Sequence, residues 1–275
     1  MPEPLGILAG GGPFPSQVAA AAQAAGRPVF IVALQGFAEP ATLAPYKHVA
    51  ARMGAAGQIL AHLRENACRD IVLVGPVRRP SLLDIRPDAE GARLLARIGR
   101  AAFAGDDGFL AAIVRVLGEE GFRVLGAHEV LREAVAPAGL LGAVAPDAQA
   151  MDDIARAQAV LRALGQADVG QACVVQQGIV LAVEAIEGTD AMLARAGALA
   201  RPGSGGVLVK LVKPHQDRRA DLPAIGPNTI VNAAAAGLRG VAVEAGGTLL
   251  HDRPACISAA DAAHLFLLGI TPDSS

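Results

Sequence analysis

The sequence predicts an α/β protein that begins with an open, doubly wound parallel sheet. Over the first 130 residues, short apolar runs alternate with longer Ala-rich amphipathic stretches, which is typical of a parallel sheet covered by helices. The first apolar run is followed by three glycines and then a helical pattern, as in a βαβ unit. Hydrophobic residues make up 52% of the 275 residues and Trp is absent, so aliphatic and small side chains must form the core.

The elements of the first half follow in order from this pattern. We expect strands at residues 5–9, 29–33, 71–74 and 124–126. We expect helices at residues 16–25, 56–65, 90–102 and 108–120. Gly26 marks the end of the first helix, because glycine readily takes the left-handed conformation that follows many helices.

A second domain is expected after a stretch of prolines and glycines. Residues 133–150 show no sustained helical or strand period and are interpreted as a linker, which leaves domains at residues 1–132 and 151–275. In the second domain we expect strands at residues 172–176, 179–184, 207–212 and 240–244. We expect helices there at residues 151–164, 190–200, 229–236 and 258–268, and a polar loop at residues 213–226.

Charge and cysteine usage exclude several classes of function. Twenty-four Lys and Arg against 26 Asp and Glu give a net charge of −2, which removes the basic excess of a general nucleic-acid-binding protein. Three widely separated cysteines indicate free, buried thiols in a reducing cytosol. The amino terminus lacks a secretory signal, and no apolar run reaches the roughly 18 to 20 residues that cross a bilayer.

Several short motifs could bind an anion or a polar substrate. Gly10, Gly11 and Gly12 could offer backbone amides to a phosphate or serve only as a tight turn, and their spacing is neither G-x-G-x-x-G nor a nucleoside-triphosphate loop. Arg78 and Arg79 follow a strand and could bind phosphate or be solvated. The pairs Asp106–Asp107 and His128–Glu129 stand at element ends, where helix capping is the structural alternative.

The densest polar runs lie in the second half. Residues 184–190 hold three carboxylates and Thr189, and oxygen ligands suit Mg²⁺ or Mn²⁺, although Thr189 or Asp190 could equally cap a helix. In the 213–226 loop, Lys213 and Arg219 could neutralise phosphate oxygens while Asp217 or Asp221 holds a metal that activates water. A self-neutralising surface loop is the alternative.

In order and spacing, these segments resemble the LpxI family of UDP-2,3-diacylglucosamine pyrophosphatases of lipid A biosynthesis. The resemblance rests on residues 5–12, 75–80, 105–107, 126–130, 169–171, 181–184 and 187–193, and on the pattern K-P-x-Q-x-x-R-x-D-x-P-x-x-G from Lys213 to Gly226. It implies a Rossmann-like N-terminal domain joined to a distinct α/β domain. It also implies hydrolysis of UDP-2,3-diacylglucosamine to UMP and 2,3-diacylglucosamine 1-phosphate (lipid X).

The resemblance also implies roles for individual residues and partners. Asp221 matches the catalytic aspartate, and with Glu187 and Asp190 it is expected to hold Mg²⁺ or Mn²⁺. Substrate contacts are expected from these residues: Gly10, Gly11, Gly12, Arg79, Thr189, Lys213, Gln216 and Arg219. A cytoplasmic homodimer in peripheral contact with the inner membrane is expected.

Two other classes of function remain open from the residues. A nucleotide-sugar or NAD-dependent oxidoreductase would use the glycine turn as a dinucleotide site, but the G-x-G-x-x-G fingerprint is missing. A non-enzymatic protein that binds lipid or sugar phosphates would keep the basic groups without needing Glu187, Asp190 and Asp221.

Overall fold

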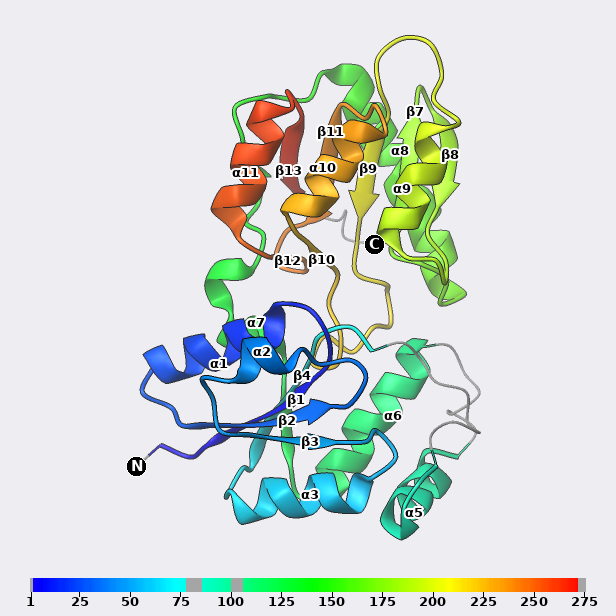
Figure 1. Cartoon of the computed structure of the whole chain (residues 1–275). Helices are drawn as coiled ribbons and strands as arrows, with labels where there is room; N and C mark the ends of the chain where they lie inside the picture. Colours follow the sequence, from blue (N-terminus) through cyan, green and yellow to red (C-terminus); the bar gives the residue numbers. More distant parts are fainter. Residues whose placement is uncertain (1, 78–85, 100–105, 272–275) are drawn as a thin grey trace. The chain divides into compact units, whose positions relative to one another are not determined.

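The computed structural model describes residues 2–77, 86–99 and 106–271, which form two compact units (Figure 1). The first unit contains Met1–Arg132 and also the short segment Asp217–Asp221 from the second half of the chain. The second unit contains Glu133–Gln216 and Leu222–Ser275. The α/β class is confirmed, with a parallel sheet in the first unit and a separate mixed sheet in the second.

The first unit is built on a five-stranded parallel sheet in the order β3-β2-β1-β4-β5. Its strands are β1 (Leu5–Ala9), β2 (Val29–Leu34), β3 (His48–Ala51), β4 (Asp70–Val74) and β5 (Arg123–Leu125). The order reverses between β1 and β4. At such a switch point an open α/β sheet has a crevice outside the carboxyl ends of its strands, where ligands bind.

Two groups of helices cover this sheet, as Figure 1 shows. The first group packs around α1 and comprises α1 (Phe14–Ala24), α2 (Pro40–Leu43) and α7 (Ala127–Val130). The second group comprises α3 (Ala56–Glu65), α5 (Ala89–Ile98) and α6 (Asp106–Glu119). Helix α5 ends at Ile98, where Gly99 takes a positive φ of 59°, and residues 100–102 of the helix expected at 90–102 lie outside the described residues.

The second unit is built on a six-stranded mixed sheet in the order β6-β13-β11-β9-β7-β8. Its strands are β6 (Gly139–Leu140), β7 (Ala172–Gln176), β8 (Ile179–Val183), β9 (Val207–Lys210), β11 (Gly240–Glu244) and β13 (Phe266–Ile270). The short strands β10 (Ala224–Ile225) and β12 (Leu249–Leu250) pair separately. The helices are α8 (Ala148–Gln166), α9 (Thr189–Gly197), α10 (Pro227–Ala235) and α11 (Arg253–Ala262).

Alternating strand residues divide the core of the second unit between the two faces of its sheet. Leu208 belongs to a cluster with residues of α9, α10 and α11, whereas its neighbours Val207 and Val209 belong to a cluster with residues of α8. Successive side chains of a strand point to opposite faces, so a sheet covered on both sides needs apolar residues at every position. The apolar runs at residues 172–175 of β7 and 207–209 of β9 meet this need, and each strand ends in a buried polar residue, Gln176 or Lys210.

Two parts of the second half differ from the expectations. The stretch at residues 133–150, interpreted as a linker, belongs to the second unit, where β6 pairs with β13, Ala136 is buried and α8 begins. The helix expected at residues 258–268 is wrong in its second half, because α11 ends at Ala262 and Phe266–Ile270 is a strand. His264 has a φ of 55° between them, which ends the helical course.

Among the described residues, the helices are too short or too polar to cross a lipid bilayer.

Candidate active site

Two turns meet at the carboxyl edge of the first sheet, one after β1 and one after β4. The amide of Gly10 donates to the carbonyl oxygen of Val74 at 2.8 Å, and the amide of Gly11 donates to that of Pro76 at 3.0 Å. A Cβ added to Gly10 would lie 2.4 Å from the carbonyl oxygen of Gly75, so only glycine permits this approach. The glycines therefore have the tight-turn role that was one of the two alternatives.

The hydrogen bonds of the glycine turn reduce the number of its amides that could bind a phosphate. Two of the three glycine amides offered to a phosphate are already hydrogen-bonded to carbonyl groups. Gly12 has a φ of 71°, a left-handed conformation that directs the chain into α1. The position at the switch point is nevertheless one where ligands bind, and a substrate contact there stays a prediction. Arg78 and Arg79 lie outside the described residues.

The segment Asp217–Asp221 forms a single tight turn. The amides of Ala220 and Asp221 both donate to the carbonyl oxygen of Asp217, at 2.9 and 3.2 Å. The Asp217 carboxylate accepts from the amide of Arg219 at 3.0 Å and from its guanidinium at 3.0 and 2.8 Å. The guanidinium lowers the pKa of Asp217 below its ordinary value. Arg219 therefore has a carboxylate partner within the turn.

The turn packs against the first unit at the carboxyl end of β5. Ala220 packs against the hydrophobic cluster that fills one side of the first sheet. The carbonyl oxygen of Arg218 would lie 3.1 Å from a Cβ placed on Gly126, the residue after β5. This packing places the turn that carries exposed Asp221 at the carboxyl end of β5, the outer strand beside β4.

Lys213 and Gln216 begin the same loop within the second unit. The Lys213 ammonium forms an ion pair with Asp168, and its backbone amide donates to Oε1 of Gln216 at 3.1 Å. Both side chains are about nine-tenths buried. A buried ammonium keeps its charge only beside a partner such as this carboxylate.

Glu187 and Asp190 frame the start of α9, but they bind different partners. Glu187 accepts from Arg195 at 2.5 Å, and Asp190 accepts from the side-chain amide of Asn232 at 2.9 Å. The backbone amide of Glu187 and the Arg195 guanidinium lower the pKa of Glu187. Thr189 donates its hydroxyl proton to Glu184 at 2.5 Å and accepts from Lys210 at 2.8 Å.

The predicted metal ligands are divided between the units. Asp221 belongs to the first unit, whereas Glu187 and Asp190 belong to the second. Within residues 2–77, 86–99 and 106–271, no three His, Cys, Asp or Glu side chains gather as a group that could hold a metal ion. The predicted ligand set, Asp221 with Glu187 and Asp190, stays a prediction.

The structure places the other two candidate pairs, Asp106–Asp107 and His128–Glu129, in the first turns of α6 and α7. Glu129 caps α7, since its Oε1 accepts from the amide of Gly126 at 2.7 Å. His128 is half-buried, and its Nδ1 has no hydrogen-bond partner in the described part of the chain. Asp106 begins α6, and the side chain of Asp107 is buried there.

Lys210 and Glu184 are polar residues of this region that the predicted site omitted. Both are at least nine-tenths buried, and both are connected through Thr189. The chain has only three lysines, and two of them, Lys210 and Lys213, lie within four residues of each other at the end of an apolar strand. That concentration at the end of an apolar strand is a signal in the sequence, because a lysine that follows a buried strand is expected to be buried only if it has a partner.

Comparison with known proteins identifies the family. The family model described as the LpxI N-terminal domain matches residues 4–134, and the one described as the LpxI C-terminal domain matches residues 137–268. The chain is also 44% identical over 274 residues to the UDP-2,3-diacylglucosamine pyrophosphatase LpxI of Caulobacter vibrioides, covering 98% of both chains. These matches run through both units and include the turn that carries Asp221, so the chain belongs to the LpxI family.

Proposed function

We propose that this protein hydrolyses the diphosphate of UDP-2,3-diacylglucosamine to UMP and 2,3-diacylglucosamine 1-phosphate, as a step in lipid A biosynthesis. The near full-length match to a protein of that named activity carries the proposal. In the reaction a water oxygen bonds to one phosphorus, the P–O bond to the bridging oxygen breaks, and the other phosphate leaves with that oxygen. The water gives up its protons.

Asp221 is the residue we propose for orienting and deprotonating the water. Its turn is fixed by two backbone hydrogen bonds to Asp217, and Ala220 anchors it on the hydrophobic cluster. An exposed carboxylate at the carboxyl edge of a sheet is well placed to meet a soluble nucleophile. We further propose that Lys213, Gln216 and Arg219 contact phosphate or uridine oxygens. To do so, Lys213 would leave Asp168 and Arg219 would leave Asp217.

The proposal includes a requirement for Mg²⁺ or Mn²⁺. A diphosphate carries negative charge that a divalent cation would neutralise when bound, and carboxylates such as Asp221, Glu187 and Asp190 are the ligands that such ions prefer. Removing metal with EDTA should abolish UMP release, and added Mg²⁺ should restore it. Full turnover in EDTA would contradict the metal requirement and leave the hydrolysis itself standing.

Asp221→Asn tests the proposed role of the Asp221 carboxylate, because asparagine has nearly the same side-chain shape but no negative charge. We expect UMP release from the lipid-linked substrate to fall by about a hundredfold or more, the usual effect of losing a proton-transfer group. Asp152→Asn, an exposed carboxylate of α8, is the matched control and should leave turnover unchanged. Undiminished turnover by Asp221→Asn would overturn the assignment. Phosphorus NMR of products formed in ¹⁸O-water would show which phosphorus the water attacks.

The acyl chains of the substrate suggest two further properties. We propose that the protein makes peripheral contact with the cytoplasmic face of the inner membrane and that it acts as a homodimer. Co-sedimentation with phospholipid vesicles tests the first property, and light scattering in solution tests the second. Recovery of all the protein in the supernatant, or a monomeric mass, would contradict the respective property.

A further inference from the structure

A polar network inside the second unit joins the two stems of the loop that carries Asp221. We call the residues Glu184, Thr189 and Lys210 the clasp. The outgoing stem of the loop is Leu211–Lys213, directly after β9, and the return stem is β10. The clasp residues come from three places, since Glu184 follows β8, Thr189 is the first residue of α9, and Lys210 ends β9.

The return stem is held through Lys210. The Lys210 ammonium donates to Oγ1 of Thr189 at 2.8 Å and to the carbonyl oxygen of Ala224 at 3.1 Å. Thr189 in turn donates its proton to Oε1 of Glu184 at 2.5 Å. Because the Thr189 hydroxyl donates its hydrogen bond to Glu184, a lone pair of its oxygen is free to accept from Lys210. Ala224 lies only three residues after Asp221 in the chain.

The outgoing stem is held through the other oxygen of the same carboxylate. Oε2 of Glu184 accepts from the amide of Gln171 at 3.0 Å, and the carbonyl oxygen of Gln171 accepts from the amide of Leu211 at 2.9 Å. Gly170 makes this approach possible, since a Cβ there would lie 1.9 Å from the carbonyl oxygen of Glu184. One carboxylate therefore connects to both stems.

The burial of the clasp makes it costly to maintain. Glu184 and Lys210 are each only 8% exposed, and placing ionised groups in such surroundings is unfavourable unless each finds partners. An apolar pair of similar volume would pack there without that cost. The clasp instead provides a set of directional hydrogen bonds whose endpoints are the two stems of one loop.

We infer that Glu184, Thr189 and Lys210 are positioning residues that hold both stems of the 211–226 loop and thereby limit the movement of the chain between the stems, which carries Asp221. This inference rests on the proposed role of Asp221. It differs from the expectation that Thr189 binds substrate directly. If Thr189 and Lys210 position the loop together, the effects of their substitutions on kcat should not add. If Thr189 contacts substrate directly, the two effects should add.

The test is a double-mutant cycle on Thr189→Val and Lys210→Met. We expect each variant to lower kcat by about ten- to a hundredfold, the scale of effect produced by displacing a reacting group by about 1 Å, with little change in KM. The double variant should be no slower than the slower single variant. Thr189→Ser, which keeps the hydroxyl, should recover most of the kcat. Thr42→Val removes an exposed threonine hydroxyl of the first unit and is the matched control.

Hydrogen exchange of the folded variants gives a readout that does not depend on turnover. Amides of residues 211–226 should exchange faster in Thr189→Val than in the wild type and Thr42→Val, while the strands of the first sheet stay unchanged. Unaltered exchange in the loop would overturn the inference, as would additive effects on kcat. If the wild type fails to release UMP, the proposed function fails, and loop exchange still decides whether the clasp holds the loop.

Discussion

Arg219 binds the carboxylate of Asp217 with two side-chain hydrogen bonds, from Nε to Oδ1 at 3.0 Å and from a terminal nitrogen to Oδ2 at 2.8 Å. Two-pronged contacts of this kind fix orientation as well as distance. The pair is only two residues apart and closes the turn that ends at Asp221. Arg219 therefore holds the shape of the turn while it is paired with Asp217, and the substrate contact proposed for it requires that pair to open.

This pair predicts how Asp217→Asn and Arg219→Ala behave. Because the pair holds the turn, both variants should lower kcat by roughly tenfold, and the double variant should be no slower in kcat than the slower single variant. Because Arg219 is also proposed to contact the substrate, Arg219→Ala should in addition raise KM, whereas Asp217→Asn should leave KM similar. Arg69→Ala, in an exposed 3.6 Å ion pair with Glu3, is the control and should leave both constants unchanged.

The pH dependence of the same pair has a defined sign. Arg219 lowers the pKa of Asp217 below its ordinary 3.8, so the stabilising contribution of the pair is present above that value and is lost as the pH falls through the folded pKa. From about pH 6 to 9 Asp217 stays ionised. The ratio of wild-type to Asp217→Asn turnover should therefore be constant over that range, and a ratio that varies would contradict the assignment.

The contact between Gly10 and Gly75 predicts a steric effect on stability. A Cβ on either residue would lie 2.4 Å from a backbone oxygen of the opposite turn, so the backbone itself must move. Gly10→Ala and Gly75→Ala should each lower the free energy of unfolding by about 1–3 kcal/mol, the usual cost of overpacking, and Gly75→Ala adds strain at its φ of 96°.

Gly118 in α6 provides a control, because an alanine there should not lower the free energy of unfolding. Among the described residues beyond its own helix backbone, no atom lies within 4 Å of the position that a Cβ would take there, and the φ of Gly118 is not positive. Gly118→Ala should therefore be neutral or stabilising by up to about 1 kcal/mol, from helix propensity alone. Urea unfolding followed by circular dichroism measures all three variants. Equal stabilities for Gly10→Ala and Gly118→Ala would show that the two turns can separate without cost.

Much of the fold was accessible from the sequence because buried strands have a simple pattern. β1 and β2 are continuous apolar runs, β7 is apolar up to its last residue, Gln176, and the expected bounds of all three strands agree with the structure within one residue. β3 was missed because three of its four residues are exposed or half-buried, which leaves little hydrophobic signal. β13 was merged with the preceding helix because the Ala-rich and Leu-rich runs are nearly contiguous.

Only part of the candidate site could be predicted from the sequence, because some of its contacts join residues that are far apart along the chain. The Asp217–Arg219 pair spans two residues, so the sequence displays it directly. The contact between Lys210 and Thr189 joins residues 21 apart, and only the packing of α9 on the second sheet brings them together. Similarly, the sequence places Asp221 in the second domain, whereas its turn packs with the first unit.

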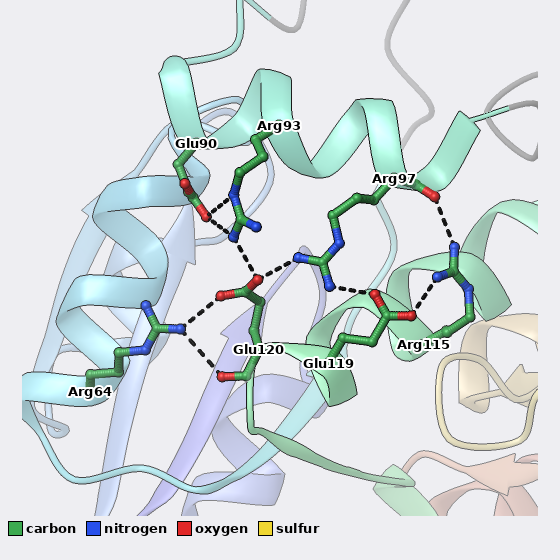
Figure 2. Close-up of polar contacts among 7 residues, drawn as sticks. All are labelled: Arg64, Glu90, Arg93, Arg97, Arg115, Glu119 and Glu120. Atoms are coloured by element: carbon green, nitrogen blue, oxygen red, sulfur yellow. Dashed lines mark hydrogen bonds and ion pairs between the residues drawn. The ribbon is translucent and has the colours of Figure 1, made fainter.

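An ion-pair network around Glu120 connects three helices of the first unit (Figure 2). The carboxylate of Glu120 accepts from Arg93 at 2.6 Å, from Arg97 at 2.5 Å and from Arg64 at 2.9 Å. These guanidinium groups, with Arg93 the largest contributor, lower the pKa of Glu120 from 4.5 to about 2. The side chain is only 11% exposed, so solvent screens these contacts less than ordinary surface ion pairs.

This network predicts a pH-dependent loss of stability in Glu120→Gln. The folded pKa is depressed, so the stabilising contribution of Glu120 is complete above about pH 4.5 and is lost as the pH falls towards about 2. At pH 7 the variant should be less stable by roughly 1 kcal/mol, as for a networked ion pair, and the difference should shrink towards pH 3. Glu65→Gln, in an exposed pair with His62, should differ little from the wild type at pH 7. Urea midpoints at both pH values measure this difference. A Glu120→Gln deficit that grows on acidification would contradict the role assigned to the network, because a carboxylate with a depressed folded pKa loses its stabilising contribution as the pH falls.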